Sequence, residues 1–98
     1  MGAGLWICYE DERIPEGGPS GTYFHSFVNV CRNNEIDAIG LDGSSNEINF
    51  ENDKLKFENE TFDMVTLISV IEHINNPSNI LKEIFRILKK KGILIIVT

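Results

Sequence analysis

The 98-residue sequence contains little of what marks extracellular, nucleic-acid-binding or membrane proteins. Its two cysteines, Cys8 and Cys31, form neither a disulfide framework nor a C-x-x-C pair, so we expect a reducing, cytoplasmic environment. The sequence has 9 Lys and Arg residues against 15 Asp and Glu, and a net charge of −6. This charge argues against a nucleic-acid partner, because such binding depends on cations that neutralise phosphates.

Long hydrophobic runs are missing as well. The longest, residues 93–97, is far shorter than the ~20 residues that cross a bilayer, so we expect no membrane partner. No basic segment followed by a long apolar run indicates a signal peptide. Apolar residues still make up 42% of the chain, enough for the core of one small domain, residues 1–98.

Short apolar segments alternate with amphipathic ones, which predicts an α/β fold with right-handed crossovers. Residues 93–97 are apolar throughout, as is typical of a strand in a parallel sheet that helices cover. Further strands are predicted at residues 5–9, 36–42 and 62–68, and a short edge strand is predicted around Ile48 and Phe50.

Two helices are predicted between these strands. Phe24, Phe27, Val28 and Cys31 recur at i, i+3, i+4 and i+7, the stripe of an amphipathic helix. The second helix is predicted to start at residues 76–77, with asparagine as the N-cap and proline at the first helical position. Its predicted end is the lysine run 89–91, with Gly92 as a left-handed cap. The predicted apolar face of this second helix comprises Ile80, Leu81, Ile84, Phe85 and Leu88.

Ligands of open α/β sheets bind beyond the carboxyl ends of the strands. The glycine-rich segment 17–21, Asp42 and segment 71–75 all follow predicted strands, so we expect them on one rim of the sheet. This convergence predicts a small-molecule site.

The glycines of this rim are Gly17, Gly18 and Gly21. A glycine turn before a helix lets backbone N–H groups approach an anionic ligand. Gly18 and Gly21 match the last two positions of G-x-G-x-x-G, but Glu16 replaces the first glycine. An ordinary surface turn therefore remains an alternative.

Three carboxylates complete the predicted nucleotide side of the site. Asp42 follows Gly21 by 21 residues, close to the ~20-residue offset at which an acid meets ribose hydroxyls, and its alternative is a solvated turn aspartate. Glu51 or Asp53 could accept a hydrogen bond from an adenine amine while Leu55 or Phe57 packs on the ring. A plain polar loop is the alternative for that segment.

Glu72 and His73 follow the predicted strand 62–68 at the same rim. A histidine in this position can serve as a general base. Two such residues without further His or Cys make a poor metal site, so no metal is predicted. The alternative is a polar pair that caps nearby backbone groups.

Three segments together resemble class I S-adenosylmethionine (SAM)-dependent methyltransferases of the type 11 kind. Residues 57–65, FENETFDMV, are similar to the entry to the family's fourth strand. Residues 70–77, VIEHINNP, resemble the segment after that strand, and residues 86–94, RILKKKGIL, resemble the helix end and fifth strand.

The resemblance implies a three-layer, Rossmann-like α/β fold with an open, mainly parallel sheet in which the first strand lies between the second and fourth. It implies SAM as the cofactor. Gly17, Gly18 and Gly21 would lie near its methionine part, Asp42 at the ribose, and Glu51 or Asp53 with Leu55 at the adenine. Ile68 and Ser69 would line the cofactor, and Glu72 and His73 would face the acceptor.

The chain departs from the family in three places. The link from Asp42 to Leu55 is short for a helix and a third strand. The loop over residues 10–21 is longer than the ~2–6 residues typical of βα loops. A rival alignment therefore puts the glycine motif at Gly2–Gly4, with residues 5–20 as an insertion and the first strand upstream. The family's last two strands are missing, so we expect an incomplete fold, a fragment of the domain, with strand 93–97 exposed at an edge that invites dimerisation.

The leading hypothesis is SAM-dependent methyl transfer to a small-molecule acceptor. One alternative is a degenerate Rossmann-like module that binds a partner through its open strand edge. Another is a nicotinamide-dependent oxidoreductase, against which the absence of a Tyr-x-x-x-Lys pair argues.

Overall fold

Strands and helices alternate along the chain and build one mixed sheet. The computed structural model describes residues 2–9, 14–15, 17–19, 22–24, 26–43 and 48–98. Within these described ranges, six strands form the sheet: β1 (Ala3–Cys8), β2 (Ile14–Pro15), β3 (Thr22–Phe24), β4 (Asp37–Asp42), β5 (Phe62–Ile68) and β6 (Leu88–Val97). The helices are α1 (Ser26–Asn33), the 3₁₀ turn η1 (Ile71–His73) and α2 (Ser78–Ile87).

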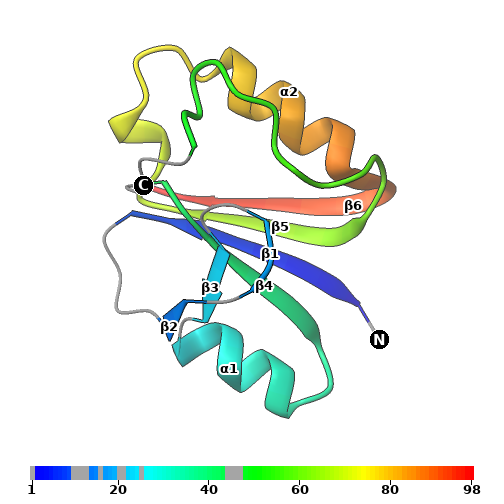
Figure 1. Cartoon of the computed structure of the whole chain (residues 1–98). Coiled ribbons are helices and arrows are strands. Elements are labelled where there is room, and N and C mark those ends of the chain that lie inside the picture. The colour runs from blue at the N-terminus through cyan, green and yellow to red at the C-terminus, as the bar shows by residue number, and fades with distance from the viewer. Residues whose placement is uncertain (1, 10–13, 16, 20–21, 25, 44–47) are drawn as a thin grey trace.

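The strand order is β2-β3-β4-β1-β5-β6, which places β1 between β4 and β5 as the resemblance implies. The four strands β4, β1, β5 and β6 are parallel, and β2 and β3 form an antiparallel hairpin beside β4. The crossovers through α1 and α2 run outward in opposite directions, so the two helices cover opposite faces of the sheet (Figure 1). The predicted open, mainly parallel, incomplete Rossmann-like fold is confirmed.

The position of β1 also decides between the two glycine alignments. β1 fills the place of the first strand, which agrees with the strand predicted at residues 5–9. Gly2 and Gly4 lie at its amino end, whereas ligands of such sheets bind at the carboxyl ends. The alternative motif at Gly2–Gly4 is therefore wrong.

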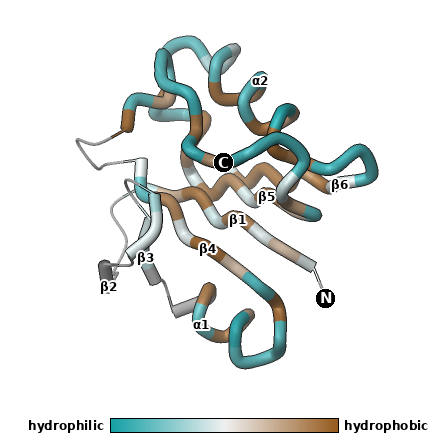
Figure 2. The backbone as a smooth tube through the Cα atoms, turned by 45° about the vertical axis from the view of Figure 1, so that its right-hand side comes forward, coloured by the Kyte–Doolittle hydropathy of each residue, from teal (hydrophilic) through white to brown (hydrophobic). Residues whose placement is uncertain are grey.

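The main core lies between the sheet and α2. Leu5 and Ile7 of β1 and Val65 and Leu67 of β5 are buried there, and apolar residues run along both central strands (Figure 2). Each side chain of this size contributes about 1.5–3 kcal/mol when it leaves water. From α2 come Ile80, Ile84 and Ile87, all fully buried.

The face of α2 differs from the prediction at two positions, Phe85 and Leu88, and Leu88 lies outside the helix because it begins β6. Phe85 is 69% exposed, and Ile87 is buried instead. Successive helical residues turn by ~100°, so Ile80, Ile84 and Ile87 share a narrow stripe from which Phe85 points away. Among the described residues, no helix is long and apolar enough to cross a membrane.

The end of α2 is not the lysine run. α2 ends at Ile87 and β6 begins at Leu88 with no loop between them. The carbonyls of Arg86 and Ile87 accept hydrogen bonds from the N–H groups of Glu60 (2.9 Å) and Thr61 (2.7 Å), so no glycine cap is needed. The predicted cap at Gly92 is therefore wrong.

Residues 89–92 form an irregular segment within β6. Phe62 pairs with Leu88 and Met64 with Ile93, so four residues of β6 lie opposite one residue of β5. A Cβ added to Gly92 would lie 2.9 Å from the carbonyl oxygen of Lys89, which explains a glycine at this bulge.

Two further predictions are corrected. Phe24 belongs to β3, so α1 starts later than its apolar stripe indicates. Ile48 and Phe50 form no strand, because residues 49–53 close a turn in which the N–H of Asp53 donates to the carbonyl of Asn49 (2.7 Å). The amide of Asn79 on α2 holds this turn through the carbonyls of Phe50 (3.0 Å) and Asp53 (2.8 Å).

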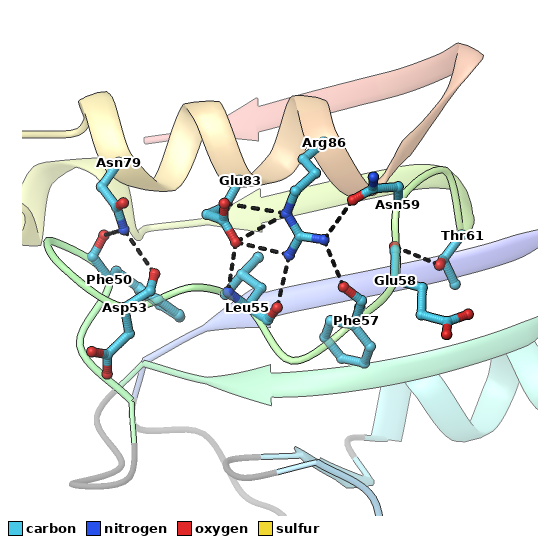
Figure 3. A network of polar contacts seen from close by, with 10 residues as sticks. All are labelled: Phe50, Asp53, Leu55, Phe57, Glu58, Asn59, Thr61, Asn79, Glu83 and Arg86. Carbon is cyan, nitrogen blue, oxygen red and sulfur yellow. Dashed lines mark hydrogen bonds and ion pairs between the residues drawn. The ribbon is translucent and has the colours of Figure 1, made fainter.

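One side chain, Arg86 of α2, fixes the segment that leads from this turn to β5 (Figure 3). Its guanidinium donates to the carbonyls of Leu55 and Phe57, both at 2.8 Å, and to the Asn59 amide oxygen at 2.9 Å. It also pairs with the buried Glu83 carboxylate at 2.8 Å, which accepts the Leu55 N–H at 2.8 Å. Hydrogen bonds from Arg86, and then from Leu55, hold the pKa of Glu83 below its usual range.

Replacing Arg86 with methionine should lower the free energy of unfolding by about 2–3 kcal/mol, because it leaves a buried carboxylate and two carbonyls without their donor. Urea denaturation followed by circular dichroism measures the change. Lys82→Met, on the exposed side of the same helix, is the matched control and should change stability by less than about 0.5 kcal/mol. Equal stabilities of the two variants would contradict this role of Arg86.

Candidate functional site

The carboxyl ends of β1 and β4 meet at one rim. Cys8 and Asp42, the last residues of these strands, are partners in the sheet register. The Gly43 N–H donates to the Cys8 carbonyl at 2.8 Å, which fixes the chain just beyond Asp42. Asp42 itself is only 1% exposed. The acid predicted at the end of its strand is thus in place, with its side chain enclosed.

An aromatic cluster lies at the same rim, and sequence reasoning missed it. The ring of Tyr9, the residue after β1, has its centroid 4.9 Å from that of His73 and 6.0 Å from that of Phe50. The Phe50 contact is edge-on, a favourable geometry for aromatic pairs. Tyr9 thus brings the predicted base His73 next to the segment that carries Glu51.

Gly43 lies beneath these rings. A Cβ built on Gly43 would be 2.7 Å from Cζ of Tyr9 and 2.5 Å from Cε2 of Phe50. Both rings therefore rest directly on the Gly43 backbone, and only glycine leaves them room.

A hollow of about 280 Å³ opens beside the cluster. This volume is just below the ~300–1,000 Å³ typical of small-molecule pockets. The predicted Glu51 contributes to its wall. The lining residues are Tyr9, Gly43, Ile48, Asn49, Phe50, Glu51 and Ile74.

The surroundings of Tyr9 favour the protonated form of its hydroxyl. Burial raises the pKa of Tyr9 above its usual value, and the nearby charges of Glu51 and Asp42 raise it further. Tyr9 therefore presents a hydrogen-bond donor near the charges of Glu51 and Asp42.

The backbone beyond β5 is strained at this rim. Ser69 has φ 52°, in the left-handed region, where a non-glycine residue costs about 1–3 kcal/mol. Its N–H donates to the Val97 carbonyl at 2.7 Å, which helps to hold this conformation. Strain of this kind clusters at functional sites.

Four other residues of the predicted site lie outside the lining of the hollow. Ile68 ends β5 and pairs with Val97, and Glu72 is exposed on η1. Asp53 is exposed, and its carboxylate accepts the Asn49 N–H at 2.8 Å. Leu55 is buried in the main core. None of these four lines the hollow.

The glycine segment differs from its expected setting. Gly17 and Gly18 lie exposed between β2 and β3, and Gly21 falls outside the described residues. β3 stands between this segment and α1, so the predicted glycine turn that opens directly into a helix is not formed. Because Thr22 pairs with Leu41, the segment lies beside the carboxyl end of β4.

Among the described residues, no group of three or more His, Cys, Asp or Glu side chains is placed to hold a metal ion. The arrangement instead suits an organic ligand. It combines an acid at a strand end, aromatic rings and a second acid on an adjoining segment.

Gly43→Ala should lower the free energy of unfolding by about 1–3 kcal/mol, because the new methyl group displaces the Tyr9 and Phe50 rings. Gly17→Ala is the matched control, since a Cβ there meets nothing within 4 Å. Thermal unfolding of both variants measures the difference. If the two substitutions cost the same, the rings do not rest on Gly43.

The comparisons with known proteins give one match. A family model described as a methyltransferase domain matches residues 21–96. The chain shows no significant similarity to curated proteins or to solved structures. The matched segment contains α1, β4, β5, α2 and most of β6, together with Asp42, Glu51, Glu72 and His73. The chain therefore belongs to the methyltransferase domain family.

Proposed function

We propose that the chain binds SAM at the rim of β1 and β4 and supports methyl transfer to a small-molecule acceptor. The observation that carries the proposal is that Asp42 ends β4 at the carboxyl edge of the sheet and is followed by Gly43, which lines the same hollow as Glu51, within a chain of the methyltransferase domain family.

The described residues fit the nucleoside end of such a cofactor. The two carboxylate oxygens of Asp42 can accept hydrogen bonds from ribose hydroxyls. Glu51, on the wall of the hollow, can accept one from the adenine amine. The absence of a side chain at Gly43 lets aromatic rings lie directly on its backbone, as the rings of Tyr9 and Phe50 do in this structure. The fit at the methionine end rests on the glycine segment, which lies beside β4 rather than between β1 and a helix.

SAM supplies a methyl group already activated on its sulfonium, so the protein's task is chiefly to align the acceptor and exclude water. His73, exposed at the rim and in contact with Tyr9, is the proposed base for an acceptor that must lose a proton. Glu72, its neighbour on η1, is the proposed orienting acid.

Calorimetric titration with SAM should give a measurable heat of binding, and Asp42→Asn should weaken the affinity at least tenfold by removing a charged acceptor. Asp37→Asn is the matched control, because Asp37 lies exposed at the other end of the same strand, and it should leave the affinity unchanged. Absence of binding by the wild type, or equal affinities of all three proteins, would contradict the proposal.

We further propose that a second copy of the chain pairs with β6. β6 is the last strand in the sheet order, and Ile93, Ile95, Ile96 and Val97 are each at least 40% exposed. This edge carries no charge between residues 93 and 97, so two copies can align it antiparallel with apolar residues opposite one another. The apolar surface continues from Ile93 and Ile95 to Met64 and Trp6 along a groove of about 630 Å³.

Sedimentation analysis at increasing concentration should show a dimer, and Ile95→Lys should shift it to a monomer. Lys90→Glu, on the bulged part of β6, is the control and should leave the dimer in place. A wild-type chain that stays monomeric at millimolar concentration would exclude this pairing.

A further inference from the structure

The structure of this rim leaves a nucleoside no free access to Asp42. Asp42 is 1% exposed, and the hollow beside it holds about 280 Å³. The rings of Tyr9 and Phe50 both occupy the surface of Gly43, the residue directly after Asp42. The place where a cofactor ring can lie on backbone is thus already filled by two rings of the protein, of which Phe50 is buried in the core and Tyr9 is half-buried.

We propose that Tyr9 is a gate of the cofactor site, whose ring lies on Gly43 in the closed state and must swing away before a nucleoside reaches Asp42. This inference rests on the proposed binding of SAM at this rim. It gives the site a closed and an open state, which differ in the position of the Tyr9 ring.

The contacts of Tyr9 support such movement. Its ring touches His73 with a centroid distance of 4.9 Å at a tilt of 52°, and Phe50 at 6.0 Å with an interplanar angle of 77°. Both are contacts between aromatic rings, which a ligand's purine ring can replace by equivalent contacts. Tyr9 is half-buried, unlike the fully buried apolar residues Leu5 and Ile7 that precede it on the same strand.

The position of Tyr9 in the chain supports it as well. Tyr9 is the first residue beyond β1, so its side chain can turn without breaking the pairing of β1 with β4 and β5. The adjacent backbone stays anchored by the bond from Gly43 to the Cys8 carbonyl. Tyr9 and Glu51 both line the hollow, so a Tyr9 ring that leaves Gly43 would widen the hollow on the side of Glu51.

A gate that is mostly closed reduces apparent affinity, because ligand binds only the fraction of molecules that are open. Tyr9→Ala removes the gate and should tighten SAM binding at least threefold by calorimetry. Tyr9→Phe keeps the ring on Gly43 and should not give this gain. In NMR spectra of the wild type, SAM should shift the His73 ring signals as the Tyr9 ring leaves them.

The outcomes separate the two proposals. If wild type and variants are folded and none binds SAM, the proposed function fails, and the gate fails with it. If wild type binds SAM but Tyr9→Ala binds equally or more weakly, only the gate is overturned, and weaker binding would make Tyr9 a stacking platform for the cofactor. If Tyr9→Ala does not fold, unchanged His73 signals on SAM binding to the wild type overturn the gate.

Discussion

The structure depends on the ion pair between Arg86 and Glu83 and the backbone groups that it gathers. Residues 48–61 have no regular secondary structure, yet they carry Phe50 and Glu51 to the rim. The Arg86 guanidinium holds the carbonyls of Leu55 and Phe57, while Glu83 holds the Leu55 N–H (Figure 3). This arrangement satisfies polar groups that would be costly to bury alone, and it fixes an irregular segment against a helix.

The candidate site follows from two constraints that meet at this segment. Parallel pairing of β1 with β4 brings Tyr9 and Asp42 to one end of the sheet, and the anchored segment brings Phe50 and Glu51 to the same place. Gly43 is the point of contact, because its bare backbone allows two rings to approach closely. A nucleoside site at this rim thus needs both the register of the sheet and α2, the helix that anchors residues 48–61.

Much of this fold could be predicted because its signals are local. The strands at residues 36–42 and 62–68 follow from periodicity. The start of α2 is predicted to within one residue: its N-cap is Pro77 rather than Asn76, and the Asn76 side chain accepts the Ser78 N–H at 3.2 Å. The end of α2 could not be predicted, because Glu60 and Thr61, the donors to its last carbonyls, lie far earlier in the sequence. The same holds for Tyr9, whose ring partners Phe50 and His73 come from two distant segments. Helical periodicity places Glu83 on the buried stripe with Ile80, Ile84 and Ile87, but its charge does not predict burial there.

The direct passage from α2 into β6 limits how this domain can vary in length. With no loop residue between Ile87 and Leu88, one inserted or deleted residue would rotate the apolar stripe of the helix by ~100° or shift the strand by one register position. Residues 89–92 already bulge out of the ladder and can absorb such a change without disturbing either neighbour. Relatives of this chain that differ in length here should therefore differ within the lysine run.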